Sequence, residues 1–123
     1  MARSFINKAI VMGNVGGDPE VRYMPNGKCV AVISIATTDS WRDKSTGEQR
    51  EETEWHKVEF FGKVAETVRD FIKQGAYIHV EGSNHTNRWT GDDNQPRKEK
   101  VIQVHSHDGL NMILPGGQSQ QAA

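Results

Sequence analysis

Residues 53–75 read TEWHKVEFFGKVAETVRDFIKQG, and the spacing of their apolar residues changes at Gly62. Before Gly62 the side chains alternate between two faces, as in a β-strand. One face carries Trp55, Lys57, Glu59 and Phe61, and the other carries His56, Val58 and Phe60. After Gly62 the apolar residues recur at helical spacing, at Val64, Ala65, Val68, Phe71 and Ile72. The sequence therefore predicts a strand followed by a helix that ends near Gly75.

Two further strands are predicted before this stretch. Residues 5–14, FINKAIVMGN, mix β-branched and apolar residues and run into the turn sequence VGGDPE. Residues 25–27, Pro-Asn-Gly, favour a tight turn and hence a hairpin. Residues 28–41, KCVAVISIATTDSW, follow that turn and are the most β-prone part of the chain.

Two more strands are predicted after the helix, at residues 76–82 and 100–113, with a turn-rich loop at 90–98 between them. The element order is then three strands, one helix and two strands. This order matches an all-β OB-fold, a five-stranded Greek-key barrel with one α-helix between strands 3 and 4. We expect this domain to span residues 1–113, and residues 114–123 to be a disordered, truncated or short linker.

Composition excludes several classes of protein. A chain of 123 residues with 35% hydrophobic content fits one domain. The lone Cys29 cannot form an intramolecular disulfide, which predicts a cytoplasmic protein, nucleoid-associated if bacterial. Asn7 and Lys8 interrupt the first apolar run, so we expect neither a signal peptide nor a membrane span. The net charge of -1 means that a nucleic-acid interaction must rest on local chemistry.

All three tryptophans, Trp41, Trp55 and Trp89, stand beside polar or charged residues. Exposed aromatics near cations are typical of single-strand binding, because any base can stack on them. The alternative is that each ring is partly buried core or covers a loop. For Trp55 and Phe61 the alternation favours stacking, since core residues do not share a face with charges. We therefore expect four stacking residues: Trp41, Trp55, Phe61 and Trp89.

The loop predicted between Trp41 and Trp55 is net acidic. Residues 42–54 hold three basic and five acidic side chains, which leaves -2. We expect this loop to act as a flexible arm and the phosphates to be contacted by cations elsewhere. The candidates are Lys8, Arg22, Lys57, Lys63, Lys73, Arg88 and Arg97.

Three motifs together resemble the bacterial single-stranded DNA-binding protein family: DPEVRYMPNG at 18–27, SWRDKSTGE at 40–48 and TEWHKVEFFGK at 53–63. The resemblance covers residues 5–112. It implies an OB-fold homotetramer that wraps single-stranded DNA without sequence preference in replication, recombination and repair. It also implies that the four aromatics stack on bases and that His56 lies at a subunit interface.

The chain departs from that family pattern in two places. Residues 84–89 read NHTNRW where the family has more arginine, so we expect weaker phosphate attraction and a shallower salt dependence. The family also ends in an acidic tip that recruits other proteins. Because the present sequence stops at PGGQSQQAA, we do not expect recruitment through such a tip.

Two other classes of function are compatible with parts of the sequence. His105, His107 and Asp108 could ligate a metal if they share a strand face, but two ligands two residues apart are also typical of a solvated strand. No nucleophile motif, phosphate-binding loop or paired carboxylates are present, so we expect no enzyme activity, metal or cofactor. An OB-fold replication-restart adaptor that acts through protein contacts is the alternative binding function, although an adaptor does not need exposed tryptophans.

Overall fold

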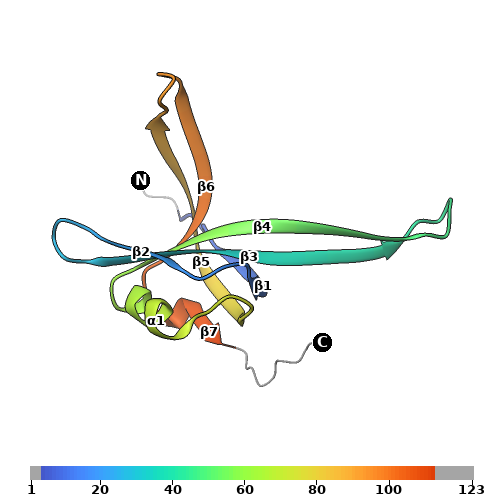
Figure 1. Ribbon diagram of the computed structural model, residues 1–123, viewed down its shortest axis with the longest axis horizontal. Helices are drawn as coiled ribbons and strands as arrows, with labels where there is room; N and C mark the ends of the chain where they lie inside the picture. The colour runs from blue at the N-terminus through green and yellow to red at the C-terminus, as the bar shows by residue number, and fades with distance from the viewer. Residues whose placement is uncertain (1–3, 113–123) are drawn as a thin grey trace.

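The computed structural model describes residues 4–112, which form a barrel with one helix against it (Figure 1). The strands are β1 (Ala9–Val15), β2 (Glu20–Tyr23), β3 (Cys29–Arg42), β4 (Gln49–Phe61), β5 (Tyr77–Thr90), β6 (Pro96–Val104) and β7 (Leu110–Met112). The helices are α1 (Lys63–Phe71) and a short 3-10 turn, η1 (His107–Gly109).

Five strands close the barrel in the cyclic order β1, β3, β4, β6, β5 and back to β1. All neighbours are antiparallel except β4 and β6, which run parallel and pair Val58 with Ile102. Along the chain, helix α1 follows β4 and precedes β5, which are the third and fourth strands of the barrel. The predicted OB-fold is confirmed.

The core is formed by the side chains that alternate toward the inside of the barrel. Ile35, Val58, Phe60 and Val80 are fully buried there, and each such side chain contributes about 1.5–3 kcal/mol through burial. Helix α1 adds its own apolar face, with Val64, Ala65, Val68 and the following Ile72 buried against the barrel.

The change from strand to helix takes place at Gly62. Its φ of 77° lies in the left-handed region, which glycine adopts without a side-chain penalty. No side chain caps the helix start, but the amide of Gly62 donates to the carbonyl of Cys29 at 2.8 Å and so fixes the turn to β3. The strand and helix predicted on either side of Gly62 are both present.

The predicted loop at 42–54 is wrong over most of its length. Strands β3 and β4 pair without interruption from Val30 opposite Phe61 to Arg42 opposite Gln49, so only residues 43–48 form a turn. The Oγ1 atoms of Thr38 and Thr53 are 3.0 Å apart across this ribbon. Hydrogen bonds between polar side chains therefore support pairing where no apolar face is present.

Other boundaries also differ from the predictions. The hairpin predicted at residues 25–27 is present, since β2 and β3 pair on either side of it, although β2 was not predicted as a separate strand. Strand β5 continues to Thr90, past its predicted end at residue 82, and of the expected loop at 90–98 only residues 91–95 lie outside strands. The last predicted strand, 100–113, is broken at His105–Gly109 by a bend and η1. Ile113 and the predicted linker at 114–123 lie outside the described residues.

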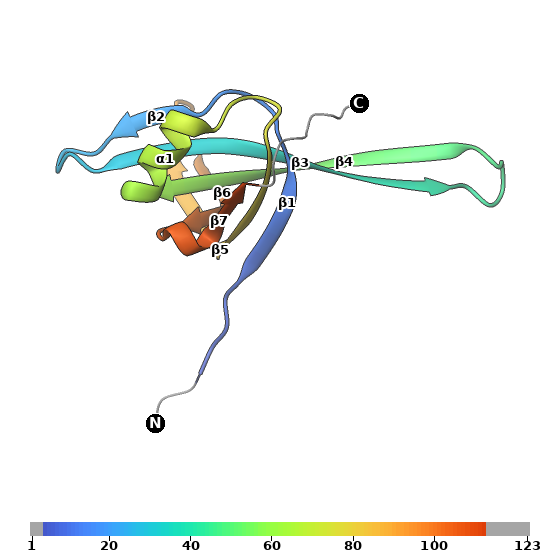
Figure 2. The same cartoon turned by 90° about the horizontal axis from the view of Figure 1, so that it is seen from below.

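Two hairpins project from the barrel in different directions (Figure 1). We call residues 37–54 the β3–β4 arm and residues 86–100 the β5–β6 arm. Figure 2 shows the β3–β4 arm extending far beyond the barrel, on the side away from α1. Within residues 4–112, no helix is long and apolar enough to cross a membrane.

Candidate nucleic-acid interface

The outward side chains of β2, β4, β5 and β6 form one continuous face. Register places Glu59 opposite Gln103, Asn87 opposite Glu99, and Trp89 opposite Arg97, so these strands present the same side. We call this the platform face. It includes Glu20, Arg22, Trp55, Lys57, Glu59, Phe61, Asn87, Trp89, Arg97, Glu99 and Gln103. The face thus contains three of the four predicted stacking residues.

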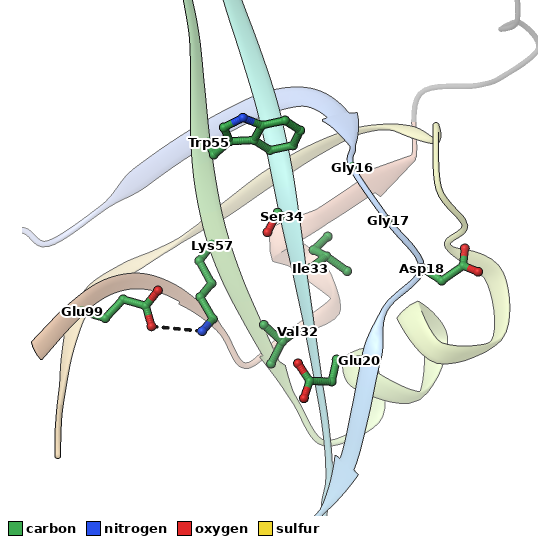
Figure 3. Close-up of a pocket in the computed structure, with 10 residues that line it drawn as sticks. All are labelled: Gly16, Gly17, Asp18, Glu20, Val32, Ile33, Ser34, Trp55, Lys57 and Glu99. Carbon is green, nitrogen blue, oxygen red and sulfur yellow. Dashed lines mark hydrogen bonds and ion pairs between the residues drawn. The ribbon is translucent and has the colours of Figure 1, made fainter. Parts of the chain in front are cut away.

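Trp55 is 57% exposed although it lies on the barrel wall. Its ring lies over Gly16, where an added Cβ would approach the ring to 2.5 Å (Figure 3). A pocket of about 650 Å³ extends from the indole past Gly17 and Lys57 to Glu99. An exposed ring at the edge of an open pocket is a suitable surface for a stacked base.

Lys57 points from β4 toward β6, where its Nζ lies 3.0 Å from Oε1 of Glu99 (Figure 3). Asp18 and Glu20 also line the pocket beside Trp55. Lys57 is therefore on the predicted surface, but its charge is balanced by a carboxylate. A phosphate that approached Lys57 would compete with Glu99 for it.

Phe61 is half-buried and stacks on a residue that was not predicted to contribute to the aromatic path. The rings of Phe61 and His105 lie 4.7 Å apart with an angle of 10° between their planes. His105 is exposed, so it extends the aromatic surface outward. No pattern in the sequence indicates this contact, because it depends on the pairing of β4 with β6, which places Val104 beside Phe60.

Trp89 is 48% exposed near the tip of the β5–β6 arm. A pocket of about 500 Å³ surrounds it, and three of its six lining residues are the cations Arg88, Arg97 and Lys98. Arg97 also pairs with Asp93, at 2.7 Å. This arm combines a ring with positive charge, which suits both a base and its phosphate.

Trp41 is 45% exposed but is not on the platform face. Register pairs Trp41 with Arg50 and pairs Trp55 with Ala36. Since Trp41 is five residues from Ala36, strand alternation turns it to the opposite side of the ribbon from Trp55. The structure thus groups Trp55, Phe61 and Trp89 and leaves Trp41 apart.

The remaining predicted cations are dispersed. Lys8 pairs with Glu81 at 3.2 Å, away from the platform face. Lys63 opens α1, and Lys73 follows that helix. Among the described residues, Arg22 is the platform-face cation that forms no ion pair. Arg22 is thus better placed than Lys57 to attract a phosphate.

Near the helix, Arg69 joins α1 to β2. Its guanidinium donates to the hydroxyl of Tyr23 at 2.8 Å and to the carboxylate of Asp70. These hydrogen bonds raise the pKa of Arg69, and the bond from Arg69 lowers the pKa of Asp70. These contacts link the exposed side of α1 to β2 and lie outside the platform face.

The histidines have separate surroundings. His56 is half-buried, and its Nε2 lies 2.9 Å from Oγ1 of Thr37. His107 Nε2 lies 2.8 Å from Oγ1 of Thr67, whereas His105 stacks on Phe61. In the part of the chain that the structure describes, no group of three or more His, Cys, Asp or Glu side chains is arranged to hold a metal ion.

Comparison with known proteins identifies the family to which this fold belongs. A family model described as the single-strand binding protein family matches residues 6–110. The chain belongs to this family. A solved structure entitled "Plasmodium falciparum SSB complex with ssDNA" matches with a TM-score of 0.77 and 28% identity, covering 92% of this chain and 97% of that one. The predicted resemblance is confirmed, and this family member shares its fold with a protein solved on single-stranded DNA.

Proposed function

We propose that this protein binds single-stranded DNA on the platform face, without catalysis, by stacking bases on Trp55, Phe61 and Trp89. The observation that carries the proposal is that three aromatic platforms from two strands share one face of the barrel. Stacking accepts any base, so the protein coats single strands during replication, recombination and repair. Its place of action is the cytoplasm.

The decisive test is Trp55→Ala. Removing one platform weakens oligo(dT) binding by about 1–3 kcal/mol, because one base loses its stacking partner. Fluorescence titration measures this loss, with Trp55→Phe as a matched control that keeps an aromatic ring. Equal affinity of a folded Trp55→Ala variant would contradict the proposal, as would equal binding of duplex DNA by the unaltered protein.

Trp41 lies apart from the platform face, and the predicted cations differ in how well they suit this proposal. The predicted phosphate contacts that suit it best are Arg22 and Arg97 on the platform face, whereas Arg88 borders the Trp89 pocket from a pair, with Lys98, on the other side of the ribbon. Lys57 and Arg97 already have acidic partners. We therefore keep the expectation of a shallow salt dependence, since fewer counterions are released by cations that are already paired.

A homotetramer is part of the proposal. Ile10, Met12 and Tyr77 are 57%, 46% and 38% exposed on the outside of β1 and β5. His79 pairs with Met12 on this surface, and its buried Nδ1 has no hydrogen-bond partner among the described residues. An apolar patch with an unpartnered polar atom suits contact with further copies, and His56 is our candidate for the same assembly. Light scattering tests the proposal, and a monomeric mass would contradict it.

A further inference from the structure

Glu59 is a buried acid on a face that is proposed to receive DNA. It is 7% exposed, the only buried charged side chain in the described part of the chain. Its two oxygens accept from Nδ2 of Asn87 at 2.9 Å and from Nε2 of Gln103 at 3.2 Å. The three side chains come from β4, β5 and β6 and thus form one hydrogen-bonded cluster across the sheet.

The cluster fixes which polar atoms remain available to a ligand. Because the carboxylate oxygens accept, each amide must turn its NH2 group toward Glu59. The carbonyl oxygens of Asn87 and Gln103 then point away from Glu59, and no described group donates to them. The wall built by these three residues is therefore rich in hydrogen-bond acceptors.

A pocket adjoins this wall. It has a volume of about 510 Å³, and Glu59, Asn87 and Gln103 line it together with Phe61 and Arg22. This volume lies within the roughly 300–1,000 Å³ of small-ligand sites. The pocket touches Phe61 but not His105, so a ligand reaches the phenyl ring from a side that the imidazole does not cover.

The chemistry of the wall selects one part of a nucleotide over another. A phosphate is repelled by a carboxylate and finds no donor in the two outward amide oxygens. The edge of a base that carries an amino group offers the donors that this wall lacks, and carboxylates in DNA-binding proteins accept from the cytosine amino group. Thymine has a carbonyl group where cytosine carries its amino group, which leaves N3–H as the one donor on its pairing edge. Arg22, on the same pocket, suits the phosphate of the nucleotide.

We propose that the Phe61 pocket is a base-edge site in which Glu59, Asn87 and Gln103 favour bases with an exocyclic amino group over thymine. The inference rests on the proposed binding of single-stranded DNA to the platform face. It adds a chemical preference at one position of a path that otherwise accepts any base.

The test compares oligo(dC) and oligo(dT) of equal length, titrated by tryptophan fluorescence into the full chain and its Glu59→Gln variant. The variant replaces a carboxylate oxygen by an NH2 donor. The affinity for oligo(dC) relative to oligo(dT) therefore falls about threefold to tenfold, which corresponds to the net free energy of one hydrogen bond. Glu99→Gln is the matched control on the same face, outside this pocket. It removes the same charge and strengthens binding of both oligonucleotides alike, so their ratio stays unchanged.

A second arm leaves the protein unaltered, in case Glu59→Gln does not fold. Oligonucleotides of 2-pyrimidinone, which is cytosine without its amino group, bind about threefold or more weaker than oligo(dC). An equal affinity for the two oligonucleotides would overturn the inference, as would an unchanged ratio in a folded Glu59→Gln variant. Failure to bind either oligo(dT) or oligo(dC) would instead overturn the proposed function, and the inference with it.

Discussion

The β3–β4 and β5–β6 arms are both two-stranded ribbons with one tryptophan near the turn, yet they present different surfaces. Trp41 and Trp89 are almost equally exposed, at 45% and 48%. However, the β3–β4 arm holds three basic and six acidic residues, which leaves -3, whereas the β5–β6 arm holds four basic and three acidic residues, which leaves +1. Only Trp89 continues the platform face. Exposure alone therefore does not distinguish the two tryptophans, whereas register and charge together do, and they favour Trp89 as the proposed stacking residue.

The largest effect is expected from Trp89→Ala. The substitution removes a ring that shares its side of the ribbon with Arg97, and oligo(dT) affinity falls by about 1–3 kcal/mol. Fluorescence or anisotropy titration measures the loss, and Trp89→Phe should recover most of it. If Trp89→Ala bound as tightly as the unaltered protein, the assignment of the β5–β6 arm to the DNA path would fail.

Trp41→Ala has a smaller expected effect, of about 1 kcal/mol or less, since the ring is on the other side of its ribbon and within a net negative arm. The same titration, run in parallel, gives the comparison. A loss larger than that of Trp89→Ala would show that the DNA path follows the β3–β4 arm and not the β5–β6 arm.

Neutralising the acidic arm should raise affinity slightly. The double variant Glu51→Gln and Glu52→Gln removes two negative charges beside the proposed path, and we expect about twofold tighter binding at low salt. Titrations at several salt concentrations check this, because screening should remove the gain as salt increases. A gain that persists at high salt would point to a cause other than long-range repulsion.

The smallest effect concerns the ribbon itself. Thr53→Ala removes the hydroxyl that lies 3.0 Å from Thr38, at a cost of a few tenths of a kcal/mol in local stability. Hydrogen exchange should become faster in the β3–β4 arm and stay unchanged in the barrel. Faster exchange throughout the molecule would mean that the arm is not an independent unit.

The barrel and one part of the site were predictable from sequence for a physical reason. In β4, Val58 and Phe60 face a core while Trp55 and Lys57 face outward, so burial on one side produces a clear period of two. The arms have solvent on both sides and leave no such period. One local signal was available, since Asp43 accepts from the amide of Ser45, an Asx turn typical of a tight connection.

The Glu59 cluster and the stack of Phe61 on His105 could not be predicted from the sequence, for a different reason. Asn87 and Gln103 are 28 and 44 residues from Glu59 along the chain, and they meet it only because β4 and β6 run parallel. His105 lies beside Phe61 because it follows Val104, which is paired with Phe60 in the parallel register of β4 and β6. Contacts of this kind depend on strand order and bends, which single-sequence patterns do not encode.

The absence of a side chain at Gly16 has a consequence for the thermodynamics of binding. With no Cβ beneath it, the indole of Trp55 rests on the backbone of the chain between β1 and β2. A ring that is already held in one orientation loses little rotamer freedom when a base is placed on it, so more of the stacking energy is retained as affinity. Gly16 thus contributes to the preorganisation of Trp55 through the side chain that it lacks.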